Sequence, residues 1–100
     1  MSTPLPDRYP RRRQVPWRTL DTEALVVDVS GGTLYPLNSV AARIWELCDG
    51  GRSVDDIVHA LAHEFDAEDA VIRRDAERFI DELTAARLVE IATAPRTEGG

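Results

Sequence analysis

The side chains with the clearest chemical potential are two histidines and one cysteine. His59 and His63 lie four residues apart in a stretch predicted to be helical, so they would share a face and could bind a metal ion together. The spacing supplies no third ligand, and the face lies opposite the apolar positions, which favours two solvated histidines. Cys48 falls on an apolar helix face with no histidine beside it, which favours a buried structural thiol. We therefore expect neither a metal nor a cofactor.

Enzymatic chemistry is the least supported class for this chain. It contains 18 carboxylates, and so many acidic side chains in a small protein always offer chance pairs. The pairs Gly31-Gly32 and Gly50-Gly51 lack the spacing and the lysine of a phosphate-binding loop. The sequence therefore predicts a protein that is not an enzyme.

Arginines near the C-terminus raise the question of nucleic acid. Arg73, Arg74 and Arg78 would lie on the recognition helix of a DNA-binding winged helix. Residues 68–87, however, hold four arginines against six carboxylates, so this segment is acidic and suits a phosphate backbone poorly. An acyl carrier is also disfavoured, because Ser39 at a predicted helix start follows asparagine where such carriers need aspartate. We expect no nucleic-acid partner.

The totals describe one small domain. A single cysteine excludes an internal disulfide framework, and no apolar run is long enough to cross a membrane. The N-terminus lacks the apolar core of a signal peptide. Residues 1–13 carry a charge of about +3, which leaves about −9 for the rest of a chain whose total is −6. These features predict a cytoplasmic protein with an acidic body and no membrane partner.

The two ends of the chain are predicted to lie outside the fold. Residues 1–16 contain four of the six prolines, and proline biases itself and the preceding residue toward extended backbone. We expect this segment to be a flexible Pro/Arg-rich arm. Residues 92–100 resemble a disordered tail, which leaves 17–91 as the folded domain.

Short strand patterns occupy the first half of the predicted domain. They cover residues 17–20, 24–29 and 33–37, with a glycine turn at 30–33 between the last two. In the middle pattern, Leu25, Val27 and Val29 share one face, and Val26 and Asp28 share the other. In the last, Tyr35 and Leu37 face one way and Leu34 the other.

Three helical patterns follow. The first begins at a capping Asn38 or Ser39 and runs to about residue 48. The second covers 53–65, where Ser53 and Asp56 have the spacing of a capping box. The third covers about 67–87, with Asp66 as its cap, and a short apolar ending at 88–91 suggests a last strand packed under the sheet. The expected fold is α+β and winged-helix-like: an N-terminal three-stranded antiparallel sheet followed by three helices.

Several segments in this order resemble the PqqD family of peptide chaperones, also described as precursor-peptide recognition elements. The resemblance covers about residues 17–91. Its main segments are the turn and strand at 31–38, the helix at 41–47, and the stretch 49–54 with Ile57. The remaining matches are residues 61–65 and the pattern Asp75, Phe79, Leu83 and Leu88-Val89. Each piece is weak alone, but the order and spacing together are fairly specific.

The resemblance implies a function and a site. Members of the family bind the leader segment of a ribosomally made peptide, as in PQQ biosynthesis, and present it to a modifying enzyme, often a radical-SAM protein. The leader lies as an added strand between the third strand and the third helix. Carried over to this chain, one wall would be Thr33, Leu34, Tyr35 and Leu37. The other would be Val71, Arg74, Asp75 and Arg78.

Three departures from the family pattern affect these expectations. Pro36 removes an amide from the strand that would pair with a leader, so pairing would be interrupted or confined to residues 33–35. Arg87 stands where many relatives have glycine, and the arginine-rich arm has no evident counterpart. The alternative functions are a winged-helix protein-interaction module or a DNA-binding regulator. A hairpin-first domain with an open edge is expected to be a monomer or a strand-swapped dimer.

Overall fold

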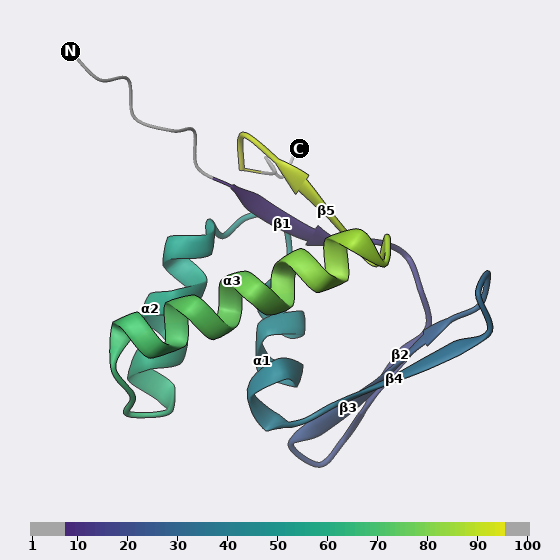
Figure 1. The fold of residues 1–100 in the computed structure, drawn as a ribbon, viewed down its shortest axis with the longest axis horizontal. Helices are drawn as coiled ribbons and strands as arrows, with labels where there is room; N and C mark the ends of the chain where they lie inside the picture. Colours follow the sequence, from purple (N-terminus) through teal and green to yellow (C-terminus); the bar gives the residue numbers. More distant parts are fainter. Residues whose placement is uncertain (1–7, 96–100) are drawn as a thin grey trace.

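The computed structural model of the protein describes residues 8–95 (Figure 1). Its elements follow in the order β1 (Tyr9–Arg12), β2 (Trp17–Leu20), β3 (Glu23–Asp28), β4 (Thr33–Leu37), α1 (Ser39–Leu47), α2 (Val54–Glu64), α3 (Asp69–Ala85) and β5 (Val89–Ala92). β2, β3 and β4 form an antiparallel sheet in that order, and β1 and β5 form a separate antiparallel pair. Figure 1 shows α3 crossing over α1, with the three-stranded sheet on one side of α3 and the β1–β5 pair on the other. The predicted α+β fold, a three-stranded sheet followed by three helices, is confirmed.

The first two helices begin where the sequence predicts. The Asn38 side chain accepts a hydrogen bond from the Ala41 N–H at 2.9 Å, which satisfies one free amide at the start of α1. At α2 the Ser53 side chain accepts from the Asp56 N–H, and the Asp56 carboxylate accepts from the Ser53 N–H. These side chains therefore fix both helix starts locally.

The third helix starts later than predicted. Asp66 does not cap it, because its φ of 49° places it in the left-handed region, where it turns the chain away from α2. Glu68 occupies the N-cap position without a side-chain hydrogen bond, and α3 begins at Asp69. The predicted cap is wrong because Asp66 belongs to the turn that follows α2, two residues before the N-cap of α3.

The core lies where the helices meet the three-stranded sheet. Trp45, Ile57 and Ile80, one from each helix, are fully buried together. From the sheet, Val26 of β3 is also fully buried, because its face and that of its cross-strand neighbours turn toward α1. The opposite face of β3 carries Leu25 and Val27, which remain half exposed. The sheet thus uses one face for the core and leaves an apolar outer face.

The described part of the predicted arm is folded, which corrects the expectation for residues 8–16; residues 1–7 lie outside the described residues. β1 pairs with β5, and Pro10 is buried opposite Ile91. The Pro10 carbonyl accepts from the Gly50 N–H at 2.9 Å, on the side away from β5. The amide that proline lacks would point the same way, so the pairing of β1 with β5 loses nothing.

The end of the chain differs from expectation in the same region. β5 was expected under the three-stranded sheet, but it pairs with β1 through residue 92, the first residue of the predicted tail. Residues 96–100 of that tail lie outside the described residues. No helix within residues 8–95 is long and apolar enough to span a membrane.

Candidate peptide-binding groove

β4 has one hydrogen-bonded edge and one open edge. It pairs with β3 alone, and within the described residues nothing pairs with its other side. The Val27 N–H donates to the Pro16 carbonyl on the β2 side, so Val27 points its backbone groups away from β4. Because bonded and non-bonded pairs alternate in an antiparallel ladder, Leu34 opposite Val27 must direct its N–H and C=O to the open edge.

The same alternation explains why Pro36 is tolerated in this strand. Pro36 lies opposite Leu25, two residues along from the pair of Leu34 and Val27, so its backbone also faces the open edge. The missing amide costs the sheet no bond to β3. The open edge therefore offers three groups in this strand: the N–H and C=O of Leu34 and the C=O of Pro36. A proline at this point also limits uncontrolled pairing of the edge with other chains.

The predicted wall residues of β4 divide between the two faces of the sheet. Leu37 is only 5% exposed and belongs to the core, so it is poorly placed to contact a ligand. Tyr35, on the same face, is half buried against the core. Leu34 is 59% exposed on the outer face, and Thr33 is exposed at the start of the strand.

The predicted wall residues of α3 lie mainly on one flank of the helix. One flank is occupied: Arg73 bonds Asp55 of α2 at 2.5 Å, and Glu77 lies 3.9 Å from Arg8 before β1. Helical spacing places a different set on the opposite flank: Val71, Asp75, Arg78, Phe79, Glu82 and Ala86. Arg74 falls between the flanks and points outward. Asp75 and Arg78 pair with each other at 3.4 Å.

The two walls share α1 as a neighbour. α3 packs against α2, β5 and α1, whereas β4 packs against β3 and α1, so α1 is the neighbour that they share. Each of the three elements has half-buried apolar side chains that pack against the core: Tyr35 of β4, Val40 and Ala41 of α1, and Phe79 of α3. We call this region the β4–α3 groove. The predicted walls did not include Val40, Ala41 or Phe79, and the sequence signal that could have found them is that each apolar residue lies at the margin of its helix's apolar stripe, where it is half-buried.

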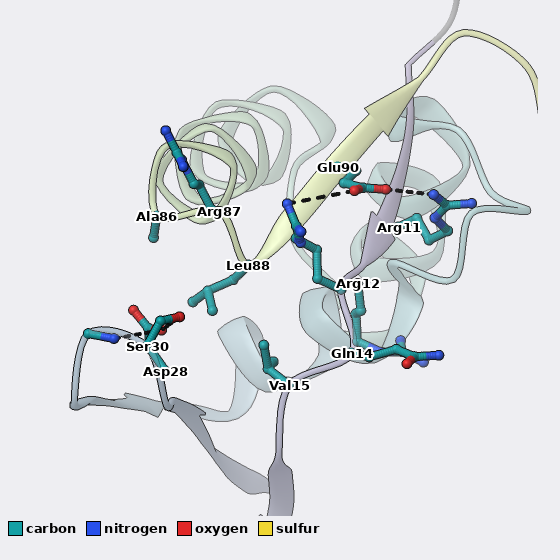
Figure 2. A pocket seen from close by; sticks show the side chains of 12 residues that line it. Arg11, Arg12, Gln14, Val15, Asp28, Ser30, Ala86, Arg87, Leu88 and Glu90 are labelled. Atoms are coloured by element: carbon teal, nitrogen blue, oxygen red, sulfur yellow. Dashed lines mark hydrogen bonds and ion pairs between the residues drawn. The ribbon is translucent and has the colours of Figure 1, made fainter.

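A polar cleft lies between the end of α3, the β3–β4 turn and the β1–β5 pair. Figure 2 shows Ala86 and Leu88, at the end of α3, on the side toward Asp28 and Ser30 of the β3–β4 turn, whereas the Arg87 side chain at the rim points away from that turn. Arginines and Glu90 of the β1–β5 pair close its far side. The cleft has a volume of about 950 Å³. We call it the arginine cleft.

The other candidate chemistries are not assembled into a site. Burial raises the pKa of the Cys48 thiol to about 12, so it stays protonated and is a poor nucleophile at neutral pH. His59 lies 3.7 Å from Asp69 on the surface. Within residues 8–95, no group of three or more histidine, cysteine or acidic side chains is placed to hold a metal ion.

The arginines that suggested DNA binding are partly committed to other partners. Hydrogen bonding to Arg73 lowers the pKa of Asp55, and Arg78 is paired with Asp75. Arg74 alone of the three forms no ion pair within the described residues. This helix therefore lacks the unneutralised positive face that a phosphate backbone requires.

Comparison with known proteins gives a consistent family. The profile described as Coenzyme PQQ synthesis protein D (PqqD) matches residues 23–89. The structure "TbiB1 in Complex with the TbiA(beta) Leader Peptide" is 27% identical, with a TM-score of 0.72, over 80% of this chain and 94% of that chain. The solution structure of the PqqD truncation of Methylobacterium extorquens PqqCD, described as a functional and stand-alone RiPP recognition element, is 25% identical, with a TM-score of 0.66, over 81% and 87%. No curated protein sequence matches.

Proposed function

Because the chain belongs to the PqqD family, we propose that it binds the leader segment of a ribosomally synthesised precursor peptide in the β4–α3 groove. The observation that carries this proposal is the open edge of β4 beside an apolar floor. An extended peptide that adds to such an edge satisfies its free backbone groups and places alternate side chains in the groove. One of the two solved relatives, TbiB1, is described in complex with a leader peptide.

Magnitudes indicate which contacts give affinity and which give selectivity. Three main-chain hydrogen bonds at about 0.5–1.5 kcal/mol each contribute roughly 1.5–4.5 kcal/mol. Two buried apolar side chains of the peptide contribute about 1.5–3 kcal/mol each. Because Pro36 shortens the run of main-chain bonds, the side chains carry at least an equal share. The protein should therefore discriminate among leaders by their apolar residues.

The protein acts in this proposal as an adaptor and not as an enzyme. It presents the bound peptide to a modifying enzyme, such as a radical-SAM protein, in PQQ biosynthesis or another pathway of ribosomal peptide modification. The cytoplasmic location and the monomer or strand-swapped dimer stay predictions from the sequence. A DNA-binding regulator is disfavoured, because the arginines of α3 lie among carboxylates that outnumber them.

The direct test is an amide chemical-shift titration of the labelled protein with the leader half of a candidate precursor peptide. We expect saturable shifts clustered on residues 33–37 and on the flank of α3 that carries Asp75 and Phe79. A scrambled peptide of the same composition serves as the control. Absence of shifts with several such leaders at tens of micromolar, or shifts elsewhere on the molecule, would contradict the proposal.

A further inference from the structure

The arginine cleft borders the ends of both elements that flank the β4–α3 groove. On the helix side, Asp75, Phe79, Glu82 and Ala86 follow one another at spacings of four, three and four residues, so they form one row along α3. Ala86, the last of this row, lines the cleft. On the strand side, Gly31 lines the cleft just before Thr33 begins β4. A peptide that follows β4 past its first residue therefore enters the cleft.

The charge of the cleft is opposite to that of the chain. Four arginines and two carboxylates line it, a net charge of +2 in a chain of net charge −6. A concave site of one sign concentrates ligands of the opposite sign. The cleft thus has the opposite sign of charge from the chain as a whole.

The two carboxylates of the cleft are already occupied. Asp28 accepts hydrogen bonds from the Ser30 hydroxyl and the Gly31 N–H, both at 3.2 Å, which hold the β3–β4 turn. Glu90 is shared between Arg11 at 2.5 Å and Arg13 at 3.7 Å. One carboxylate between two guanidinium groups leaves positive charge uncompensated.

The four arginines have different commitments. Arg12 donates to the Trp45 and Glu46 carbonyls at 2.9 and 2.7 Å and thereby holds the end of α1. Arg87, in contrast, forms no ion pair or side-chain hydrogen bond within residues 8–95. Its φ of 63° lies in the left-handed region that favours glycine at a helix end. Arg87 is thus an unpaired cation at a position where glycine would be less strained. This combination indicates that its side chain serves binding and not the stability of the fold.

We propose that the arginine cleft is a subsite for acidic side chains of the bound peptide, with Arg87 and Arg13 as the groups that contact the carboxylates. This inference rests on the proposed peptide binding and adds the chemical class that the site selects. β4 runs from the turn toward α1, so a peptide added antiparallel runs toward the turn. The acidic residues are therefore those that follow the paired segment.

The test is selection of a displayed library of random dodecapeptides on the full-length protein. We expect the selected peptides to carry apolar residues followed by Asp or Glu. Peptides selected on the Arg87→Gly variant should still carry the apolar residues but should no longer be enriched in Asp or Glu. An acidic peptide from the first selection should bind this variant about three- to tenfold more weakly. Arg18→Gln, which removes an exposed arginine of β2 outside the cleft, is the matched control and should keep the acidic preference.

The thermal stability of the Arg87→Gly variant shows whether Arg87 has a binding role or a structural one. Arg87→Gly relieves the left-handed backbone, so its Tm should rise while acidic-peptide binding falls. A fall in both Tm and binding would overturn the inference, because Arg87 would then support the fold.

The remaining outcomes distinguish the two proposals. Selected peptides without an acidic preference would overturn the arginine cleft alone. Failure to select any peptide that depends on the β4 edge would overturn peptide binding and the cleft with it. A third outcome is that inorganic phosphate shifts the Arg87 amide resonance saturably while the selected peptides show no acidic preference. This result would assign the cleft to a free anion and overturn the inference.

Discussion

β1 and β4 each contain one proline in a short strand, yet their surroundings differ. β1 is occupied on both edges: β5 pairs with one, and on the other Arg12 N–H donates to the Cys48 carbonyl while the Gly50 N–H donates to Pro10. β4 is occupied on one edge only. In both strands the proline faces away from the β partner, so neither ladder loses a bond.

A proline in the strand therefore does not decide whether an edge is open. The edge of Pro10 is filled by the loop between α1 and α2, which brings its own donors and acceptors. The edge of Pro36 has no such loop within the described residues. The two edges therefore differ in whether a neighbouring segment covers them, and the proposed peptide would take that place at β4.

Arg12→Ala should cause the largest loss of stability, because Arg12 supports the region around β1, where both strand edges are occupied. Arg12 holds two carbonyls at the end of α1 and lies 5.4 Å over the ring of Trp17. Hydrogen bonds to charged groups contribute about 1.5–3 kcal/mol each, so we expect a loss of about 3 kcal/mol of unfolding free energy. Urea denaturation measures it. Arg13→Ala, which removes only an exposed ion pair, is the control and should cost under about 1 kcal/mol; equal losses would contradict the assigned role.

Leu34→Asp tests the open region. Leu34 lies beside the edge that a peptide would join, and we expect roughly tenfold weaker leader binding with little change in helical content. Fluorescence anisotropy and circular dichroism measure the two quantities. Leu20→Asp is the matched control, because Leu20 is 51% exposed on the outer face of the other edge strand, β2. If Leu20→Asp weakened binding more, the peptide would lie on β2.

Pro36→Ala should strengthen leader binding at the open edge of β4. It adds an amide to the open edge, and one further hydrogen bond is worth about 0.5–1.5 kcal/mol, so leader affinity should rise about two- to tenfold. The same amide makes the edge a better template for self-pairing, which analytical ultracentrifugation would detect. Pro16→Ala, outside β4, should change neither quantity. Unaltered affinity in Pro36→Ala would mean that the peptide does not use this part of the edge.

Lowering the pH should produce the smallest effect, a small loss of stability in the β1–β5 pair. A hydrogen bond from Arg11 lowers the pKa of Glu90 below its ordinary 4.5. The folded carboxylate therefore adds stability above that value, and this stability is lost as the pH falls through the lower folded pKa. Side-chain NMR titration of Glu90 measures the shift. Arg11→Gln should return the pKa toward its ordinary value, and an unchanged titration would contradict the assigned cause.

Local signals in the sequence predicted much of the fold. The caps at Asn38 and Ser53 depend on side chains within a few residues, and both were confirmed. β1 could not be predicted, because its pairing depends on segments about 80 residues away, and its prolines and arginines are typical of an exposed arm. The buried face of β3 is also decided by tertiary packing, since both faces carry apolar side chains.

The candidate site was only partly accessible from the sequence. The strand 33–37 and its edge position follow from local pattern, but the placement of Leu37 in the core depends on contact with α1. The arginine cleft joins Arg13, Asp28 and Arg87 from three distant segments. No spacing in the chain brings these together, so the cleft required the structure.

The pairing of Tyr9 with Ala92 has a consequence for how this fold can be combined with others. The first and last strands of the described fold enter and leave side by side, on the opposite side of α3 from β4 (Figure 1). The domain can therefore be grafted into a surface loop of a larger enzyme through two adjacent tethers. A host attached in this way would leave the open edge of β4 facing outward.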